Sequence, residues 1–223
     1  MQMPSSARRF AAAGAVASTL LAVPAGAAPV AGPGHDAYGR LHPLADLSAR
    51  RLATADLVAA AKRGTGSPVD DPAREKRVLD TVARQAREAG GDPGVTVRIL
   101  RDQIEANKHV QRALHSRWDA EPSAAPAQRP DLDDVRQEIN RVNTELVHAI
   151  ADSPAARAAP SCGAELTAAK TRVRRDRHLD GVHAAALTHA LRSVCAAAPA
   201  ESDFRAPANG VTVPGRRSPR SII

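Results

Sequence analysis

Residues 93–120, PGVTVRILRDQIEANKHVQRALHSRWDA, place apolar and amide side chains at alternating steps of three and four. The residues at this spacing are Val97, Leu100, Ile104, Asn107, Gln111, Leu114 and Trp118. Such steps keep side chains on one face of an α-helix, and the stripe is typical of the inward seam of a helical bundle. We therefore predict one long helix over residues 92–120 at the centre of the fold.

The regions on both sides of this segment also have helical patterns. Alternating β-branched runs are absent, and the helix-favouring residues Ala, Leu, Arg, Glu and Gln dominate. Asp71 and Pro72 provide a capping side chain and a first-turn proline. The predicted helices cover residues 43–64, 71–90, 92–120, 131–152, 162–177 and 179–198. We predict an all-α fold, with a single domain over residues 43–199 of about six helices around one long central helix.

The N-terminus has the features of an export signal over residues 1–27. Arg8 and Arg9 precede an apolar segment, and small residues suited to cleavage follow at 25–27. A membrane anchor is the alternative, but the apolar run is short and Pro24 ends it. We predict a cleaved signal, a secreted or periplasmic location, and no membrane attachment after cleavage.

The two remaining end segments have compositions that do not favour packed structure. Residues 28–42 are rich in Ala, Pro and Gly, which predicts a flexible lead-in. After Pro199 no apolar periodicity remains, so residues 200–223 are predicted to be a disordered tail.

The net charge of +7 first suggests a nucleic-acid partner. Two of these charges belong to the predicted signal and two to the tail, which leaves about three on the body. Between residues 40 and 199 the one aromatic residue is Trp118, so a base-stacking surface is missing. The sequence therefore argues against nucleic-acid binding.

The chain has two cysteines, Cys162 and Cys195. We expect the last two helices to form an antiparallel hairpin that turns near His178, which lies 16 residues after the first cysteine and 17 before the second. Nearly equal distances from a turn place two positions side by side, and disulfides persist in exported proteins. We predict a structural disulfide, because neither a metal-ligand spacing nor a C-x-x-C motif is present.

Cations interrupt the apolar face of the first predicted helix. Arg51 falls between Leu47 and Ala55 at steps of four, and Lys62 follows Val58 by four. Eleven residues of helix separate the two cations by only about 20° around the axis and about 16 Å along it. Both side chains are therefore predicted to point inward.

Further polar groups occupy stripes that otherwise look buried. Asn107 and Gln111 lie mid-seam, Arg136 lies at the margin of the fourth helix's stripe, and Arg74 follows the Asp71 cap. Singly, such a cation usually extends to water and such an amide fixes helix register. Together they would be costly to bury without a neutralising anion, and few inward carboxylates are available. The pattern predicts a small, multiply charged anionic guest inside the bundle.

Three segments resemble the exported branch of the all-helical chorismate mutases. They are residues 51–62 (RLATADLVAAAK), 68–74 (PVDDPAR) and 102–111 (DQIEANKHVQ), and Arg136 and the cysteine pair also match that branch. No single motif is highly specific, but their order and spacing extend over residues 44–199. The resemblance implies an isomerase that rearranges chorismate to prephenate, with no cofactor, no metal and no covalent intermediate.

The resemblance also implies roles for seven residues. The catalytic roles fall to Arg51, Lys62, Arg74 and Gln111, and further substrate contacts to Asp71, Asn107 and Arg136. Arg51 and Arg136 would hold the carboxylates, with Arg74 nearby, and Lys62 and Gln111 would donate hydrogen bonds to the ether oxygen. Asn107 would contact a carboxylate, and Asp71 or its backbone would orient the hydroxyl. Relatives in this branch are typically homodimers with each site inside one subunit.

Two positions depart from the pattern of the branch. Some relatives have Glu where this chain has Gln111, and close relatives have a polar residue where it has Val78, which would weaken substrate binding. The main alternative function is an exported helical module that binds an anion or a protein without turnover. A degenerate mutase that binds chorismate but does not convert it is a second alternative.

Overall fold

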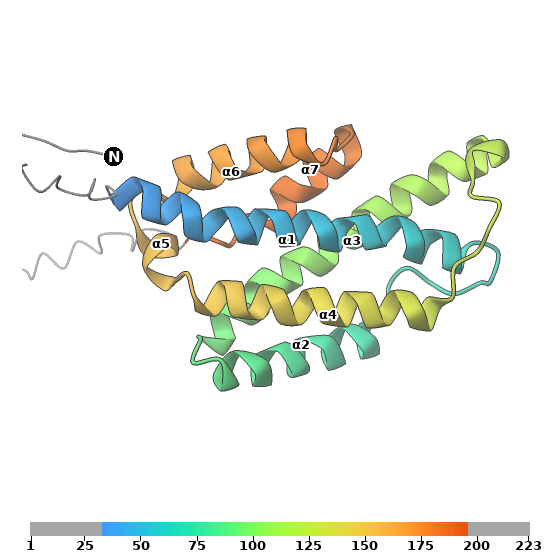
Figure 1. Ribbon diagram of the computed structural model, residues 1–223. Helices are drawn as coiled ribbons and strands as arrows, with labels where there is room; N and C mark the ends of the chain where they lie inside the picture. Colours follow the sequence, from blue (N-terminus) through green and yellow to red (C-terminus); the bar gives the residue numbers. More distant parts are fainter. Residues whose placement is uncertain (1–32, 196–223) are drawn as a thin grey trace, which may run out of the picture. The chain divides into compact units, whose positions relative to one another are not determined.

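The structure, a computed structural model, describes residues 33–195, and in this range it contains helices and no strand (Figure 1). The elements are α1 (Pro33–Lys62), α2 (Pro72–Glu88), α3 (Pro93–Ala120), the 3-10 helix η1 (Pro122–Ala124), α4 (Leu132–Ala151), α5 (Pro154–Ala158), α6 (Cys162–Asp176) and α7 (Gly181–Ala190). The predicted all-α class is confirmed. The predicted signal at 1–27 and tail at 200–223 lie outside the described residues.

The first helix begins earlier than its sequence predicts. α1 starts at Pro33 and contains Pro43 in its interior, so the predicted flexible lead-in is corrected to helix over residues 33–42. An internal proline costs a helix about 3 kcal/mol or more. Leu41 and Leu44 on either side are fully buried, and their packing offsets that cost. Tertiary packing overrides the local composition here.

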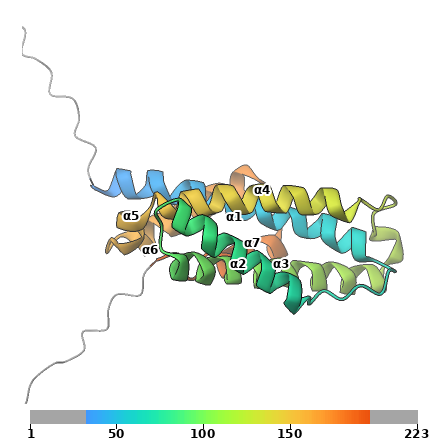
Figure 2. The same ribbon diagram turned by 90° about the horizontal axis from the view of Figure 1, so that it is seen from below.

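Two long helices, rather than one, organise the fold. α1 packs against α3, α4 and α6, and α3 packs in addition against α2 and α7. α1 lies between α4 and α6 in Figure 1, and in Figure 2 α1 and α4 form one layer above α2 and α3. The largest fully buried side chains include Leu52, Leu100 and Leu146, one from each of α1, α3 and α4.

Aspartates fix the starts of the helices that approach the site. Asp71 accepts the backbone N–H of Arg74 at 2.9 Å, and Asp92 accepts two backbone N–H groups at the start of α3. Pro72 and Pro93 occupy the first turns, where a missing N–H costs nothing. The predicted caps therefore set where α2 begins and, with it, where Arg74 lies.

The predicted disulfide between Cys162 and Cys195 is confirmed, with a Cα–Cα distance of 5.8 Å. The chain turns near His178 as predicted, with a positive φ of 50° at that residue. α6 nevertheless packs mainly on α1, and α7 mainly on α3, so the two helices contact each other little. The disulfide joins the start of α6 to the segment after α7. The short helix α5 was not predicted, and α7 ends at Ala190, before the predicted boundary at 198.

Candidate active site

A cavity of about 230 Å³ lies between α1, α2, α3 and α4, with the loop of residues 63–71 along one side. Its lining includes all seven predicted site residues, Arg51, Lys62, Asp71, Arg74, Asn107, Gln111 and Arg136. Apolar side chains, including Val58, Val78 and Ile104, complete the walls. Ligand cavities of this kind combine apolar walls with a few convergent polar groups, and this volume suits a guest smaller than a drug molecule.

Arg51 is buried and lines the cavity. Its Nε donates to Oδ1 of Asn143 at 2.8 Å, and its Nη1 donates to the backbone carbonyl of Gln103 at 2.8 Å. Burial lowers the pKa of Arg51 to about 10. Within residues 33–195 no carboxylate lies within ion-pair distance of its guanidinium.

Sequence reasoning missed Asn143, although a signal was present. Asn143 follows Ile139 by four residues and precedes Leu146 by three, so it lies on the apolar stripe of α4. It is only 3% exposed. A polar residue at a buried stripe position needs a polar partner, and Arg51 is that partner.

Asn107 and Gln111 form a buried chain of amides on α3. Asn107 donates to the backbone carbonyl of Arg51 at 3.2 Å, and Gln111 donates to Oδ1 of Asn107 at 2.7 Å. The Gln111 amide carries two hydrogens and uses one of them in this contact. The second hydrogen is free to serve an acceptor in the cavity.

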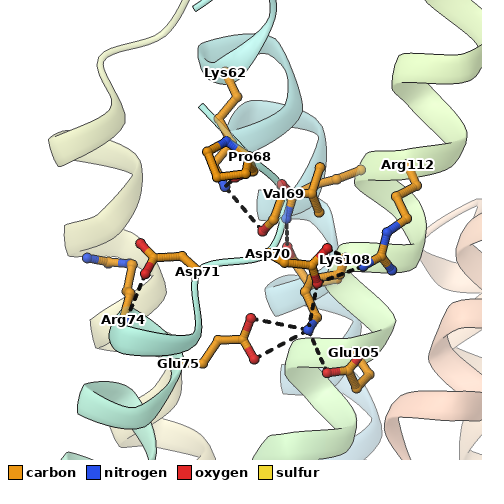
Figure 3. A network of polar contacts seen from close by, with 12 residues as sticks. Lys62, Pro68, Val69, Asp70, Asp71, Arg74, Glu75, Glu105, Lys108 and Arg112 are labelled. Atoms are coloured by element: carbon orange, nitrogen blue, oxygen red, sulfur yellow. Dashed lines mark hydrogen bonds and ion pairs between the residues drawn. The ribbon is translucent and has the colours of Figure 1, made fainter. Parts of the chain in front are cut away.

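Lys62 lies at the end of α1, next to the loop of residues 63–71 (Figure 3). Its Nζ donates to the backbone carbonyls of Pro68 at 2.7 Å and Val69 at 3.4 Å. Burial lowers the pKa of Lys62, the Asp71 carboxylate opposes this shift, and the charges of Arg136 and Arg74 add to it. An ammonium group has three hydrogens, so one remains after the two loop contacts.

Arg74 and Arg136 face the cavity from α2 and α4. Burial lowers the pKa of Arg74, and the nearby charge of Arg136 lowers it further. Arg136 is the one predicted cation with an ion-pair partner among residues 33–195, since it contacts Asp133 at 2.7 Å on its own helix. The site therefore collects four cations, three of which have no carboxylate partner in the described part of the chain.

Lys108 is a fifth cation in the lining, and sequence reasoning missed it. Its Nζ contacts carboxylates of Glu105 at 2.7 Å, Asp70 at 3.1 Å and Glu75 at 3.1 Å (Figure 3). Burial disfavours its charge, but hydrogen bonds to these three carboxylates outweigh burial and raise the pKa of Lys108. Glu75 also lines the cavity, which corrects the expectation of few inward carboxylates, but Lys108 already neutralises it.

The arrangement can bind a compact anion with at least two negative groups and can donate hydrogen bonds from Lys62 and Gln111. Within residues 33–195, His, Cys, Asp and Glu side chains form no group of three or more placed to hold a metal ion.

A family model described as chorismate mutase type II matches residues 43–112. The secreted chorismate mutase of Mycolicibacterium smegmatis is 38% identical over 155 residues, which cover 70% of this chain and 86% of that protein. The secreted chorismate mutase of Mycobacterium tuberculosis is 36% identical over 164 residues, covering 74% of this chain and 82% of that protein.

Solved structures give the same result. The crystal structure of a chorismate mutase from Burkholderia phymatum superposes with a TM-score of 0.68 at 33% identity, and covers 72% of this chain and 99% of that one. A chorismate mutase from Burkholderia thailandensis gives a TM-score of 0.67 at 32% identity, with 70% and 99% covered.

Proposed function

Because the chain belongs to the chorismate mutase family, we propose that it rearranges chorismate to prephenate in the cavity between α1, α2, α3 and α4. The chain is an isomerase, and chorismate is its substrate. Chorismate is a dianion, and in the reaction an ether C–O bond breaks while a C–C bond forms within the same molecule. No nucleophile or proton transfer is required, so catalysis depends on holding a compact conformer and on stabilising the negative charge that develops on the ether oxygen.

Arg51 and Arg136 hold the two carboxylates of the substrate, and Arg74 lies close to the same groups. The support is electrostatic, since Arg51 and Arg74 are desolvated and lack an acidic partner among residues 33–195. A doubly charged guest would supply the missing counter-charge. Asn107, held by the Arg51 carbonyl, contacts a carboxylate, and Asp71 orients the hydroxyl group.

Lys62 and Gln111 donate hydrogen bonds to the ether oxygen. Each has a donor hydrogen left after its contacts within the protein, and each is fixed before the substrate arrives. Preorganised donors stabilise a developing charge without reorganisation during the reaction, and removal of one typically costs about 10²–10³-fold in turnover. A module that binds an anion or a protein without turnover, the alternative function, would make no use of this pair of fixed donors.

One observation carries the proposal, namely that two amides and three cations without a carboxylate partner among residues 33–195 converge on one cavity. We expect Lys62→Ala to lower kcat by at least about 10²-fold, measured from the ultraviolet absorbance of chorismate, with helical circular dichroism unchanged. Lys76→Ala is the matched control, because Lys76 pairs with Asp80 on the exposed face of α2. Near-normal turnover in folded Lys62→Ala would remove Lys62 from its assigned role.

The chain is exported, with residues 1–27 as a cleaved signal and the folded domain following it. The relatives named above are secreted proteins, and the Cys162–Cys195 disulfide suits an oxidising compartment. No helix among residues 33–195 combines the length and apolarity that a membrane span requires. N-terminal sequencing of the protein from culture fluid tests this, and a mature chain that begins at Met1 would contradict it.

The mature protein is a homodimer with a complete site in each subunit. One chain supplies all seven site residues, six from α1–α4 and Asp71 from the loop before α2, so a partner need not complete the cavity. Sedimentation equilibrium should give twice the subunit mass. Turnover per subunit should stay constant on dilution through dissociation, and a loss of turnover with dissociation would contradict a site inside one subunit.

A further inference from the structure

The loop of residues 63–71 forms a thin wall of the site. A second cavity, of about 360 Å³, lies on the other side of this loop. Lys62, Ser67, Pro68 and Val69 line both cavities. Because space lies on either side of the loop, apolar packing does little to fix it, and its position depends on a few polar contacts.

The loop is attached to α3 through Asp70 (Figure 3). Both carboxylate oxygens of Asp70 accept from Nη2 of Arg112 at 2.7 Å, and Lys108 lies 3.1 Å from one of them. These bonds lower the pKa of Asp70, so it is a carboxylate at any ordinary pH. Lys108 in turn contacts Glu75 and Glu105, which ties the loop, α2 and α3 together.

The loop also contacts Lys62, in addition to a hydrogen bond from Arg63 at its start to the backbone carbonyl of Trp118 at 3.1 Å. The carbonyls that accept from Nζ of Lys62 belong to Pro68 and Val69, directly before Asp70 in sequence. The turn between Lys62 and these carbonyls contains Gly64 and Gly66, both with positive φ of about 70°. The position of Asp70 therefore sets where the two carbonyls lie, and the carbonyls set the direction of the remaining N–H of Lys62.

We infer that Asp70, held by Arg112 and Lys108, is a positioning residue for Lys62. Asp70 does not line the substrate cavity, and it acts by holding the loop carbonyls against the ammonium group. The inference rests on the proposed role of Lys62 as donor to the ether oxygen. Without the Asp70 contacts the loop is released, Lys62 samples several orientations, and the preorganised donor is lost.

The test is Asp70→Asn, which keeps side-chain size and removes the charge. A misplacement of about 1 Å can cost up to about 10²-fold in rate, so we expect kcat to fall about 10-fold or more. KM should change less than threefold, because Arg51 and Arg136, which hold the carboxylates, form no hydrogen bond with the loop. Asp80→Asn is the matched control, since it removes another aspartate ion pair, on exposed α2, and should leave both constants unchanged.

A double-mutant cycle shows whether Asp70 acts through Lys62. In the Lys62→Ala background, Asp70→Asn should have no further effect on the residual turnover. A general loss of structure would instead lower turnover equally in both backgrounds. Arg112→Gln removes the stronger partner of Asp70 and keeps Lys108, so kcat should fall less than in Asp70→Asn. If Asp70→Asn does not fold, Arg112→Gln decides the question.

Two results would overturn the inference: a folded Asp70→Asn with kcat within twofold of wild type, or an equal loss in the presence and absence of Lys62. Failure of the proposed function gives a different pattern. In that case Lys62→Ala itself keeps near-normal turnover, whatever Asp70→Asn does.

Discussion

The buried guanidinium of Arg51 illustrates how a residue can be kept charged and still available. Asn143 and the Gln103 carbonyl accept two of its hydrogen bonds without neutralising it. A carboxylate in place of Asn143 would also hold Arg51 in position. It would, however, neutralise the positive charge that attracts the substrate. Neutral acceptors position a cation and leave its electrostatic attraction to the guest intact.

This difference predicts the effect of Asn143→Asp. The new carboxylate competes with the substrate for Arg51, and a charge-assisted hydrogen bond contributes about 1.5–3 kcal/mol. We expect KM for chorismate to rise about 10- to 100-fold with no loss in melting temperature, measured by steady-state kinetics and thermal unfolding. Asn140→Asp, one turn earlier on the exposed face of α4, should leave KM unchanged. An unchanged KM in Asn143→Asp would mean that Arg51 does not hold the substrate.

The identity of Gln111 predicts a flat pH profile. A carboxyl group at this position would donate a hydrogen bond only when protonated, whereas an amide donates at any ordinary pH. The buried cation Arg51, with its pKa near 10, also keeps its charge through this range. Turnover should therefore vary little between pH 5 and 8 in a stopped-flow or steady-state assay, and a pronounced fall with folding intact would argue against Gln111 as the donor.

Single residues of the site could be predicted to the extent that periodicity places them on a buried stripe. Arg51, Lys62, Asn107 and Gln111 were found in this way, and they line one cavity. Lys108 was missed because it follows a seam residue directly, and only the tertiary structure shows that Glu75 and Asp70 reach it. The spacing of residues within one helix does not reveal contacts with segments that are distant in the sequence.

At the scale of elements, His183 links α7 to α1. Its ring lies 3.1 Å from Asp56 of α1 and 2.9 Å from Asp180, which also caps α7. The hydrogen bond to Asp56 raises the pKa of His183 to about 9, burial opposes the shift, and Asp180 adds to the rise. The charged ring therefore joins the two helices at neutral pH.

This contact predicts how stability depends on pH. A folded-state pKa above the ordinary value of about 6.5 means that the stabilisation is complete below that pH and is lost as pH rises through about 9. The melting temperature should fall over this window in the wild type, and the fall should be smaller in His183→Gln. His148→Gln, exposed on α4, is the control and should keep the wild-type slope. Equal slopes in all three proteins would exclude His183 as the group involved.

Helix boundaries were predictable where capping residues mark them. Asp71, Asp92 and Asp131 begin helices within two residues of the predicted positions. The start of α1 could not be predicted, because Pro43 and a Pro- and Gly-rich composition argue against a helix there. Burial of Leu41 and Leu44 stabilises the helix nevertheless. The local sequence shows the free-energy cost of a helix in such a segment, and tertiary packing offsets that cost.

At the scale of the whole molecule, the pairing of helices could not be predicted from spacing. The turn at His178 and the cysteine positions predicted the disulfide, yet α6 and α7 pack on different partners, α1 and α3. Equal distances from a turn bring two ends together without requiring contact in between. Which helix each of α6 and α7 packs against depends on complementary apolar faces that are distributed over the entire fold.

The place of the disulfide predicts a separation of stability from activity. The link joins α6 to the segment after α7, whereas the cavity lies among α1–α4. Reduction should lower the melting temperature substantially, since a bridge of this span contributes about 3–4 kcal/mol on the chain-entropy model. Turnover at room temperature should change less than twofold, and the Cys162→Ala/Cys195→Ala double variant should behave like the reduced protein. A parallel loss of turnover at temperatures where the helices persist would contradict this separation.

The proposed substrate contacts run from Arg51 to Arg136, and the remainder of the described chain, from α5 onward, supplies no group to the cavity. That last quarter of the described residues instead packs on α1 and α3. A shortened chain that stops after α4 would keep every proposed substrate contact, but it would expose large apolar surfaces to water. The final helices therefore cover the apolar faces of the catalytic helices, and apart from specific contacts such as His183–Asp56 and the disulfide, their residues can vary to adjust solubility or lifetime without altering the chemistry.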